Sequence, residues 1–142
     1  MMLPLATAAA LLLNAAPALS LDMCRGGDRA ARKVTCLVDG DTGWENGVKW
    51  RLKGIDTPEY PQGRPDCEAE VEYAKAATFR MLSLMRAGYS IEWMGESDGS
   101  RELVRIHLAD GRDAGTILIE EGFAVHWPHP DGVWCVSKSP RD

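Results

Sequence analysis

Two short acidic clusters, with one arginine between them, contain the residues of this 142-residue chain that could do chemistry. The first cluster is Asp39-Gly40-Asp41-Thr42, the second is Asp56-Thr57-Pro58-Glu59, and the arginine is Arg51. Carboxylate oxygens at turns suit a hard cation such as Ca²⁺, which takes several oxygen ligands in irregular geometry. A guanidinium suits a phosphate, because its planar fork donates two parallel hydrogen bonds. A cation, an arginine and a free carboxylate together could cut a phosphodiester.

Short strands and tight turns are predicted around both clusters. Residues 33–38 are rich in apolar and β-branched side chains and predict a strand, which the Asp39-Gly40 turn ends. Residues 42–45 predict the returning strand, and Asn46-Gly47 predicts a hairpin turn into a third strand at 48–55. We therefore expect the two acidic clusters to face each other.

The rest of the chain predicts a helix, two strands and a second helix. Apolar residues recur at helical spacing over 67–87, and residues 89–94 and 103–108 predict strands separated by a loop at 95–100. Residues 114–121 predict a short helix that Gly122 closes. This order indicates an α+β fold. Five short strands favour a closed β-barrel, with the main helix after strand 3 and the short helix after strand 5.

Composition and charge narrow the function. A hydrophobic content of 45% suits a globular domain with a core, and the length suits one domain. Sixteen Lys and Arg against 21 Asp and Glu give a net charge of -5. This balance argues against a tight, electrostatically driven nucleic-acid binder, because such proteins neutralise phosphates with clustered basic residues. It does not exclude an enzyme that meets phosphates at one local site.

Residues 1–21 form an apolar run with small residues before its end, which is typical of a cleaved secretory signal. The alternative is a membrane anchor, but Asn14 and Pro17 interrupt a run that is short for a bilayer span. We expect a periplasmic or secreted protein with no stable membrane association after cleavage. Residues 22–142 then form a single domain, with a core at 33–126 and an irregular tail at 127–142.

Four cysteines in a small exported chain favour disulfides, for which three connectivities exist. Metal binding is the competing interpretation, but the cysteines are scattered without a CxxC pair. We prefer Cys24 with Cys36, which would tie the N-terminal segment to the first strand. Cys67 with Cys135 would then pin the tail to the start of the main helix.

Several motifs in order resemble the thermonuclease family, the staphylococcal-nuclease-like domain. They are Val38-Asp39-Gly40-Asp41-Thr42, Arg51-Leu52 with Ile55-Asp56-Thr57-Pro58-Glu59, Ser97-Asp98-Gly99-Ser100-Arg101, Asp110-Gly111-Arg112, and Leu118-Ile119 with Gly122-Phe123-Ala124. The resemblance covers residues 33 to about 126. It implies an oligonucleotide-binding-type (OB-fold) β-barrel and Ca²⁺-dependent hydrolysis of DNA and RNA with low sequence specificity.

The resemblance also implies a role for each matching position. Asp41 and Asp56 would supply carboxylates to Ca²⁺, and Thr57 a backbone carbonyl. Glu59 would contact the metal through water and act as the general base. Arg51 and Arg101 would hold the scissile phosphate and stabilise its charge. This chain departs from the family pattern at Gly99, where an aromatic residue that contacts substrate is often found, and in its short tail.

Other interpretations stay open at this point. We expect the three histidines, His107, His126 and His129, to be surface residues, whereas Trp127 and Trp134 in the tail could stack on bases. The first functional hypothesis is a monomeric nuclease that acts on DNA and RNA, with single strands preferred. The second is a non-catalytic OB-fold module that binds a nucleic acid or a protein. The third is a phosphodiesterase or phosphatase for small nucleotides.

Overall fold

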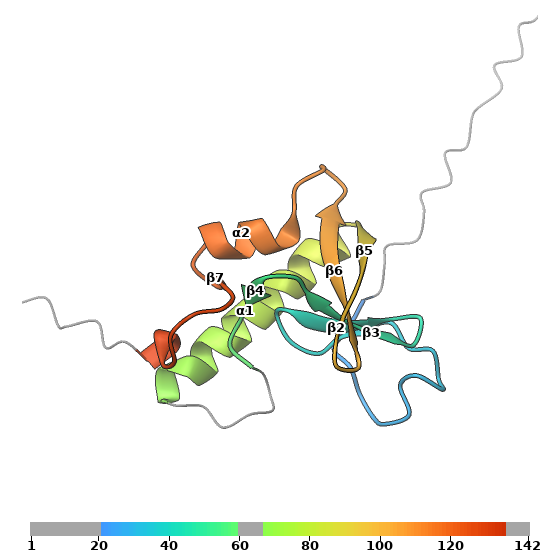
Figure 1. Cartoon of the computed structure of the whole chain (residues 1–142), viewed down its shortest axis with the longest axis horizontal. Coiled ribbons are helices and arrows are strands. Elements are labelled where there is room, and N and C mark those ends of the chain that lie inside the picture. The colour runs from blue at the N-terminus through green and yellow to red at the C-terminus, as the bar shows by residue number, and fades with distance from the viewer. Residues whose placement is uncertain (1–20, 60–66, 136–142) are drawn as a thin grey trace, which may run out of the picture.

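A computed structural model of the chain describes residues 21–59 and 67–135. These residues form an α+β fold with two α-helices and a mixed five-stranded sheet (Figure 1). The predicted signal segment, apart from Leu21, and the tail beyond residue 135 lie outside the described residues. In the part that is described, no helix combines the length and the apolar character needed to cross a bilayer.

The first acidic cluster lies at the turn into β2 (Thr42–Glu45) of the five-stranded sheet, whereas the second begins on β4 (Ile55–Asp56), outside that sheet. The strand order of the five-stranded sheet is β1-β2-β3-β6-β5, with antiparallel neighbours except for the parallel pair β3 and β6. A separate two-stranded ladder joins β4 to β7. The strand bounds are β1 Cys36–Leu37, β2 Thr42–Glu45, β3 Val48–Leu52, β4 Ile55–Asp56, β5 Tyr89–Asp98, β6 Arg101–Leu108 and β7 Val125–His126.

The closed barrel expected from the sequence is wrong, because β1 and β5 are the two edges of an open sheet in the described residues. The strand expected at 33–38 is short, since the turns before it place Lys33 at a φ of 50°. The strand expected at 48–55 divides at a turn where Gly54 has a φ of 68°, a conformation that favours glycine. β5 instead continues through the loop expected at 95–100, as far as Asp98.

The sheet nevertheless curls, so that strands that are not neighbours approach each other. The hydroxyl of Tyr89, on edge strand β5, donates a hydrogen bond of 2.6 Å to Oε2 of Glu45 on β2. Burial raises the pKa of Tyr89, and the hydrogen bond to Glu45 raises it further. The two edge strands of the sheet are therefore not paired with each other, although the sheet curves so that β2 and β5 approach each other.

The two helices cover the sheet and complete the core. α1 (Glu68–Arg86) and α2 (Ala114–Glu120) lie within a residue of the expected bounds at 67–87 and 114–121. α1 buries one face, which includes Met81 and Met85, against core residues of β3 and β6 such as Trp50. Burial of each large apolar side chain contributes about 1.5–3 kcal/mol. Strand β3, which carries Arg51, therefore packs on the hydrophobic core.

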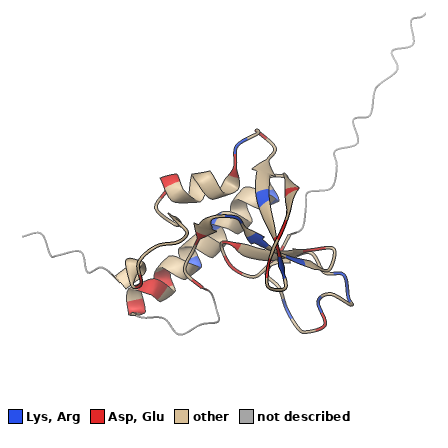
Figure 2. Cartoon of the chain, in the orientation of Figure 1, with Lys and Arg blue, Asp and Glu red and all other residues tan. Residues whose placement is uncertain are grey.

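Two disulfides, Cys24–Cys36 and Cys67–Cys135, are present, and they are the two pairs preferred from the sequence. The second joins residues 68 positions apart and holds the short 3-10 helix η1 (Val133–Cys135) beside the start of α1 (Figure 1). Acidic residues occupy that first turn of α1 (Figure 2), where the helix dipole favours negative charge. The disulfide turns the tail back along the molecule.

Candidate functional site

A pocket of about 490 Å³ contains most of the residues singled out from the sequence. Asp41, Arg51, Asp56, Glu59 and Arg101 all line it, whereas Thr57 is buried and does not. The two acidic clusters therefore lie close to each other, and Arg101, at the start of β6, lies near both. The remaining lining residues are Asp39, Thr42, Leu52, Gly54, Asp98, Leu103 and Trp127.

Arg51 lies at the centre of the pocket, with only 12% of its side chain exposed. Its Nη1 is 2.6 Å from Oδ2 of Asp41, and its Nη2 is 3.1 Å from Oδ1 of Asp56. The contact with Asp41 is an ion pair without good hydrogen-bond geometry, whereas Nη2 donates a hydrogen bond to Asp56. Burial alone would lower the pKa of Arg51, but the two carboxylates outweigh it and raise that pKa. One guanidinium thus holds both acidic clusters.

Local hydrogen bonds fix the carboxylate of Asp41. The Thr42 hydroxyl donates to its Oδ1 at 2.7 Å, and the backbone N–H of Thr57 donates to its Oδ2 at 2.9 Å. A Cβ at Gly40 would lie 2.8 Å from the Thr57 hydroxyl, so the two turns approach this closely only with glycine there. The Asp-Gly-Asp-Thr and Asp-Thr-Pro-Glu motifs therefore contact each other directly.

The side chain of Asp39 stabilises the same turn through a hydrogen bond. The backbone N–H of Asp41 donates to its Oδ1 at 3.1 Å, and the side chain is buried. Burial raises the pKa of Asp39 from 3.8 to about 9, and the neighbouring Asp41 carboxylate contributes to the rise. Asp39 therefore holds its proton more readily than a freely exposed aspartate does.

Glu59 and Arg101 form the exposed part of the pocket. Glu59 is exposed, and within the described part of the chain its side chain has no hydrogen bond or ion pair. Arg101, whose side chain is 32% exposed, forms an ion pair with Asp98 across the β5–β6 turn. Gly99 occupies that turn with a φ of 60° and open space around it. Both side chains are therefore accessible from solvent at the pocket.

His129 belongs to the site, and the expectation that it is a surface residue is wrong. Its side chain is 14% exposed, its Nε2 is 2.5 Å from Oδ2 of Asp56, and its Nδ1 is 2.8 Å from the Pro130 carbonyl. A neutral imidazole has one N–H, so the ring can donate to both acceptors only when it carries two protons. The hydrogen bond to Asp56 raises the pKa of His129 accordingly.

The tail delivers both His129 and Trp127 to the site. Backbone pairing of β7 with β4 places the chain beside Asp56, and the rings of Trp127 and His129 meet edge to face with centroids 5.2 Å apart. Trp127 is 56% exposed. The signal that could have revealed this was the cysteine near the end of the tail, because a disulfide to the main helix requires the tail to fold back.

The donor chemistry of the pocket fits a hard cation. Across residues 21–59 and 67–135, no three acidic, histidine or cysteine side chains form a ready-made metal cage. Calcium sites, however, combine carboxylates with backbone carbonyls and water. Here the carboxylates of Asp41 and Asp56 both approach the guanidinium of Arg51, and carboxyl groups outnumber guanidinium groups among the lining residues. The carboxyl groups are Asp39, Asp41, Asp56, Glu59 and Asp98, and the guanidinium groups are Arg51 and Arg101.

Comparison of the chain with models of protein families and with curated proteins gives no match. The resemblance to the thermonuclease family therefore rests on the sequence motifs alone.

Proposed function

We propose that the chain is a Ca²⁺-dependent nuclease of the thermonuclease type, which hydrolyses phosphodiester bonds in DNA and RNA. One observation carries the proposal. Asp41 and Asp56, from separate turns, converge on the guanidinium of Arg51 in a pocket that also contains Arg101 and Glu59. Such a set combines acidic oxygen donors, phosphate ligands and a carboxylate that no other described residue engages, which is what cleavage of a phosphodiester needs.

The two arginines would bind the non-bridging oxygens of the scissile phosphate. Charge grows on these oxygens as the bond breaks, and preorganised cations lower the barrier most where charge develops. Arg51 is preorganised by its ion pairs with Asp41 and Asp56, while Arg101 would exchange Asp98 for phosphate. Because each guanidinium can make two parallel hydrogen bonds, the pair would also fix the orientation of the phosphate.

Glu59 would act as the general base that accepts the proton of the attacking water. Its position in the pocket and its exposure support this role, because a base must reach both water and substrate. The Asp41 and Asp56 carboxylates and the Thr57 carbonyl would hold Ca²⁺. Bound Ca²⁺ would supply positive charge that neutralises the phosphate in the transition state.

The substrate we propose is single-stranded or locally unpaired nucleic acid. The exposed ring of Trp127 offers a surface on which any base can stack, which is compatible with low sequence specificity. The strand order, the parallel β3–β6 pair and the curl of the sheet support a partly open OB-fold arrangement, a fold that binds oligonucleotides. The acidic chain should bind its substrate weakly and release products readily.

A secreted or periplasmic location belongs to the same proposal. The two disulfides are compatible with an oxidising compartment, where such bonds persist. We propose that the mature domain acts there as a monomer.

A non-catalytic binding module is the second candidate, and one observation favours it. Both Arg51 and Asp56 already have partners within the protein, the latter in Arg51 and His129, so the pocket is stable without substrate. A binding module would retain oligonucleotides through Trp127 and the loops but would not cleave them. Only an assay of cleavage separates the two candidates.

The experiment measures release of acid-soluble nucleotides from single-stranded DNA and from RNA by the folded, oxidised protein. We expect release with Ca²⁺ and its loss with a chelator, and Glu59→Gln should abolish most of the release in Ca²⁺. A parallel assay with mononucleotide diesters tests whether small nucleotides are the preferred substrates. Equal and negligible release with and without Ca²⁺, accompanied by oligonucleotide binding, would favour the binding module.

A further inference from the structure

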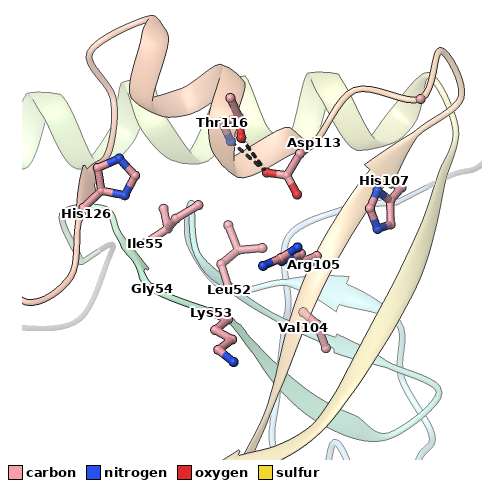
Figure 3. Close-up of a pocket in the computed structure, with 11 residues that line it drawn as sticks. Leu52, Lys53, Gly54, Ile55, Val104, Arg105, His107, Asp113, Thr116 and His126 are labelled. Atoms are coloured by element: carbon pink, nitrogen blue, oxygen red, sulfur yellow. Dashed lines mark hydrogen bonds between the residues drawn. The ribbon is translucent and has the colours of Figure 1, made fainter.

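A second pocket, of about 560 Å³, adjoins the first and has a different charge (Figure 3). Leu52 and Gly54 line both pockets, so the two pockets are neighbours at the end of β3. The second pocket also contains Lys53, Arg105, His107 and His126, against one carboxylate among its lining residues, Asp113. The first pocket is rich in carboxyl groups and the second in basic side chains, although the chain as a whole is acidic.

Strand β6 connects the two pockets along one face. Side chains two residues apart on a strand point the same way, so Arg101, Leu103, Arg105 and His107 form one row. The first two line the first pocket and the last two line the second. At about 3.3 Å per residue, Arg105 lies roughly 13 Å along the strand from Arg101. This separation lets the two arginines contact different phosphates of one strand.

Arg105 is the group best placed to bind an anion. Figure 3 shows its side chain extending from β6 towards Leu52, inside the pocket. Arg105 is exposed, and it has no hydrogen bond or ion pair with any residue of the described ranges. The other arginines near the two pockets, Arg51 and Arg101, are both held by carboxylates. An unengaged guanidinium in a concave site is a natural ligand for a phosphate.

The neighbouring groups would support such a contact. Lys53 and His107 contact Glu96 and Glu92 of β5 at 2.6 and 3.0 Å, in exposed pairs that contribute little and can be exchanged for a phosphate. The carboxylate of Asp113 is engaged, because it caps α2 by accepting hydrogen bonds from the Thr116 N–H and hydroxyl (Figure 3). It therefore opposes an incoming phosphate less than a free carboxylate would.

We propose that this second pocket binds a backbone phosphate of the same nucleic-acid strand, beyond the scissile phosphate, with Arg105 as its principal ligand. The inference rests on the proposed function for the identity of the strand. It explains how an acidic protein could hold an oligonucleotide, because the basic residues that contact it are gathered along one face of β6. It also predicts that longer substrates bind better than dinucleotides.

The test measures binding by fluorescence anisotropy in the Glu59→Gln background with Ca²⁺, so that the labelled oligonucleotides stay intact. The probes are a thymidine dinucleotide and an oligothymidylate of about eight nucleotides, which is within the range that one OB-fold covers. The parent should bind the longer probe more tightly. Arg105→Ala should remove most of that advantage and leave the dinucleotide affinity unchanged. It should also reduce the slope of log affinity against log salt by about 0.7, the value for one single-strand phosphate contact.

Two further variants make the result specific. Arg105→Lys keeps the charge and should recover part of the affinity for the longer probe. Arg25→Ala removes the same charge from an exposed residue that lines neither pocket, and it should change neither affinity. Equal affinity of the parent for both probes, or an Arg105→Ala variant with an unaltered salt slope, would overturn the inference. An equal loss of affinity for both probes in Arg105→Ala would also overturn the inference, because Arg105 would then act at the scissile phosphate.

The inference and the proposed function fail in distinguishable ways. If the unmodified protein cleaves nothing but Arg105 still supports binding of the longer probe, the nuclease proposal is wrong and the phosphate site stands. If cleavage depends on Ca²⁺ but does not respond to Arg105→Ala at any substrate length, the phosphate site is wrong and the nuclease proposal stands.

Discussion

The two arginines of the candidate site occupy contrasting surroundings. Arg51 lies on a central strand, mostly buried, between carboxylates from two distant turns. Arg101 begins β6 beside a turn, is more exposed, and pairs only with Asp98 three residues away. Arg51 therefore links two turns of the structure as well as lining the pocket, whereas Arg101 has a local ion pair and links no distant segments among the described residues. The same residue type should give different responses to mutation in the two places.

The largest effect is expected at Arg51. Arg51→Ala should lower turnover by about 10²–10³-fold, as loss of one donor to a developing oxyanion typically does. It should also cost about 3–5 kcal/mol of stability, because it leaves the buried Asp41 carboxylate without its charged partner. Turnover and denaturant unfolding of the same preparation measure both.

Arg51→Lys is the matched control for that variant, because it retains a charge but not the planar fork. Compared with Arg51→Ala, the Arg51→Lys variant should regain more of the lost stability than of the lost turnover. An Arg51→Ala protein as stable as the parent would contradict the structural half of the comparison.

Arg101→Ala should give a comparable loss of turnover, of about 10²–10³-fold. Its unfolding free energy should change by less than about 0.5 kcal/mol, because the side chain is exposed and its ion pair is local. Glu59→Gln should behave in the same way, since Glu59 is exposed. Steady-state kinetics and urea unfolding provide the two measurements. If Arg101→Ala destabilised the fold as much as Arg51→Ala, the two arginines would not differ as the comparison requires.

Removal of the Cys67–Cys135 disulfide tests whether the tail, which carries Trp127 and His129, contributes to the site. Replacing both cysteines by serine should lower stability by about 2–4 kcal/mol, because the bond closes a long loop in the unfolded chain. It should also raise KM more than it lowers kcat, because the tail that carries Trp127 and His129 loses its anchor. The double Ser variant of Cys24 and Cys36 is the control, since it loses a disulfide that does not hold the tail. Equal KM effects in both would argue against a role for the tail.

The smallest effect is expected on stability when Tyr89 is changed, on the sheet that carries Arg51 and Arg101. Tyr89→Phe removes the hydrogen bond to Glu45 and should cost about 1 kcal/mol. The pKa of Tyr89 is raised in the folded state, so its stabilisation is complete below the unfolded pKa of about 10 and is lost as pH rises through the folded pKa. Unfolding measured from pH 8 to pH 11 should therefore show a shallower alkaline decline for Tyr89→Phe than for the parent. Parallel declines would contradict the effect of burial on this tyrosine.

The sequence predicted the local parts of the site well, because its signals are local. Gly40 in a tight turn, the Asn46-Gly47 hairpin and the register that sets Arg51 opposite Thr42 all arise from short-range turn and strand chemistry. The helix bounds followed from the spacing of buried side chains such as Met81 and Met85.

Long-range features could not be predicted in the same way. Barrel closure depends on how far the edge strands extend, and neither the turn at Lys33 nor the extension of β5 to Asp98 has a clear signal. His129 reaches Asp56 from 73 residues away through the return of the tail, which no local pattern encodes. Arg105 lies in none of the sequence motifs, although the fold places it in the lining of the second pocket.

The most direct test of the account is a calorimetric titration of Ca²⁺ into the unmodified protein and into Asp56→Asn. The account holds that the carboxylates of Asp41 and Asp56 share one hard cation. It therefore predicts binding of a single ion per chain, with affinity at least about tenfold lower in Asp56→Asn. Absence of binding by the unmodified protein, or the same affinity in both, would contradict it.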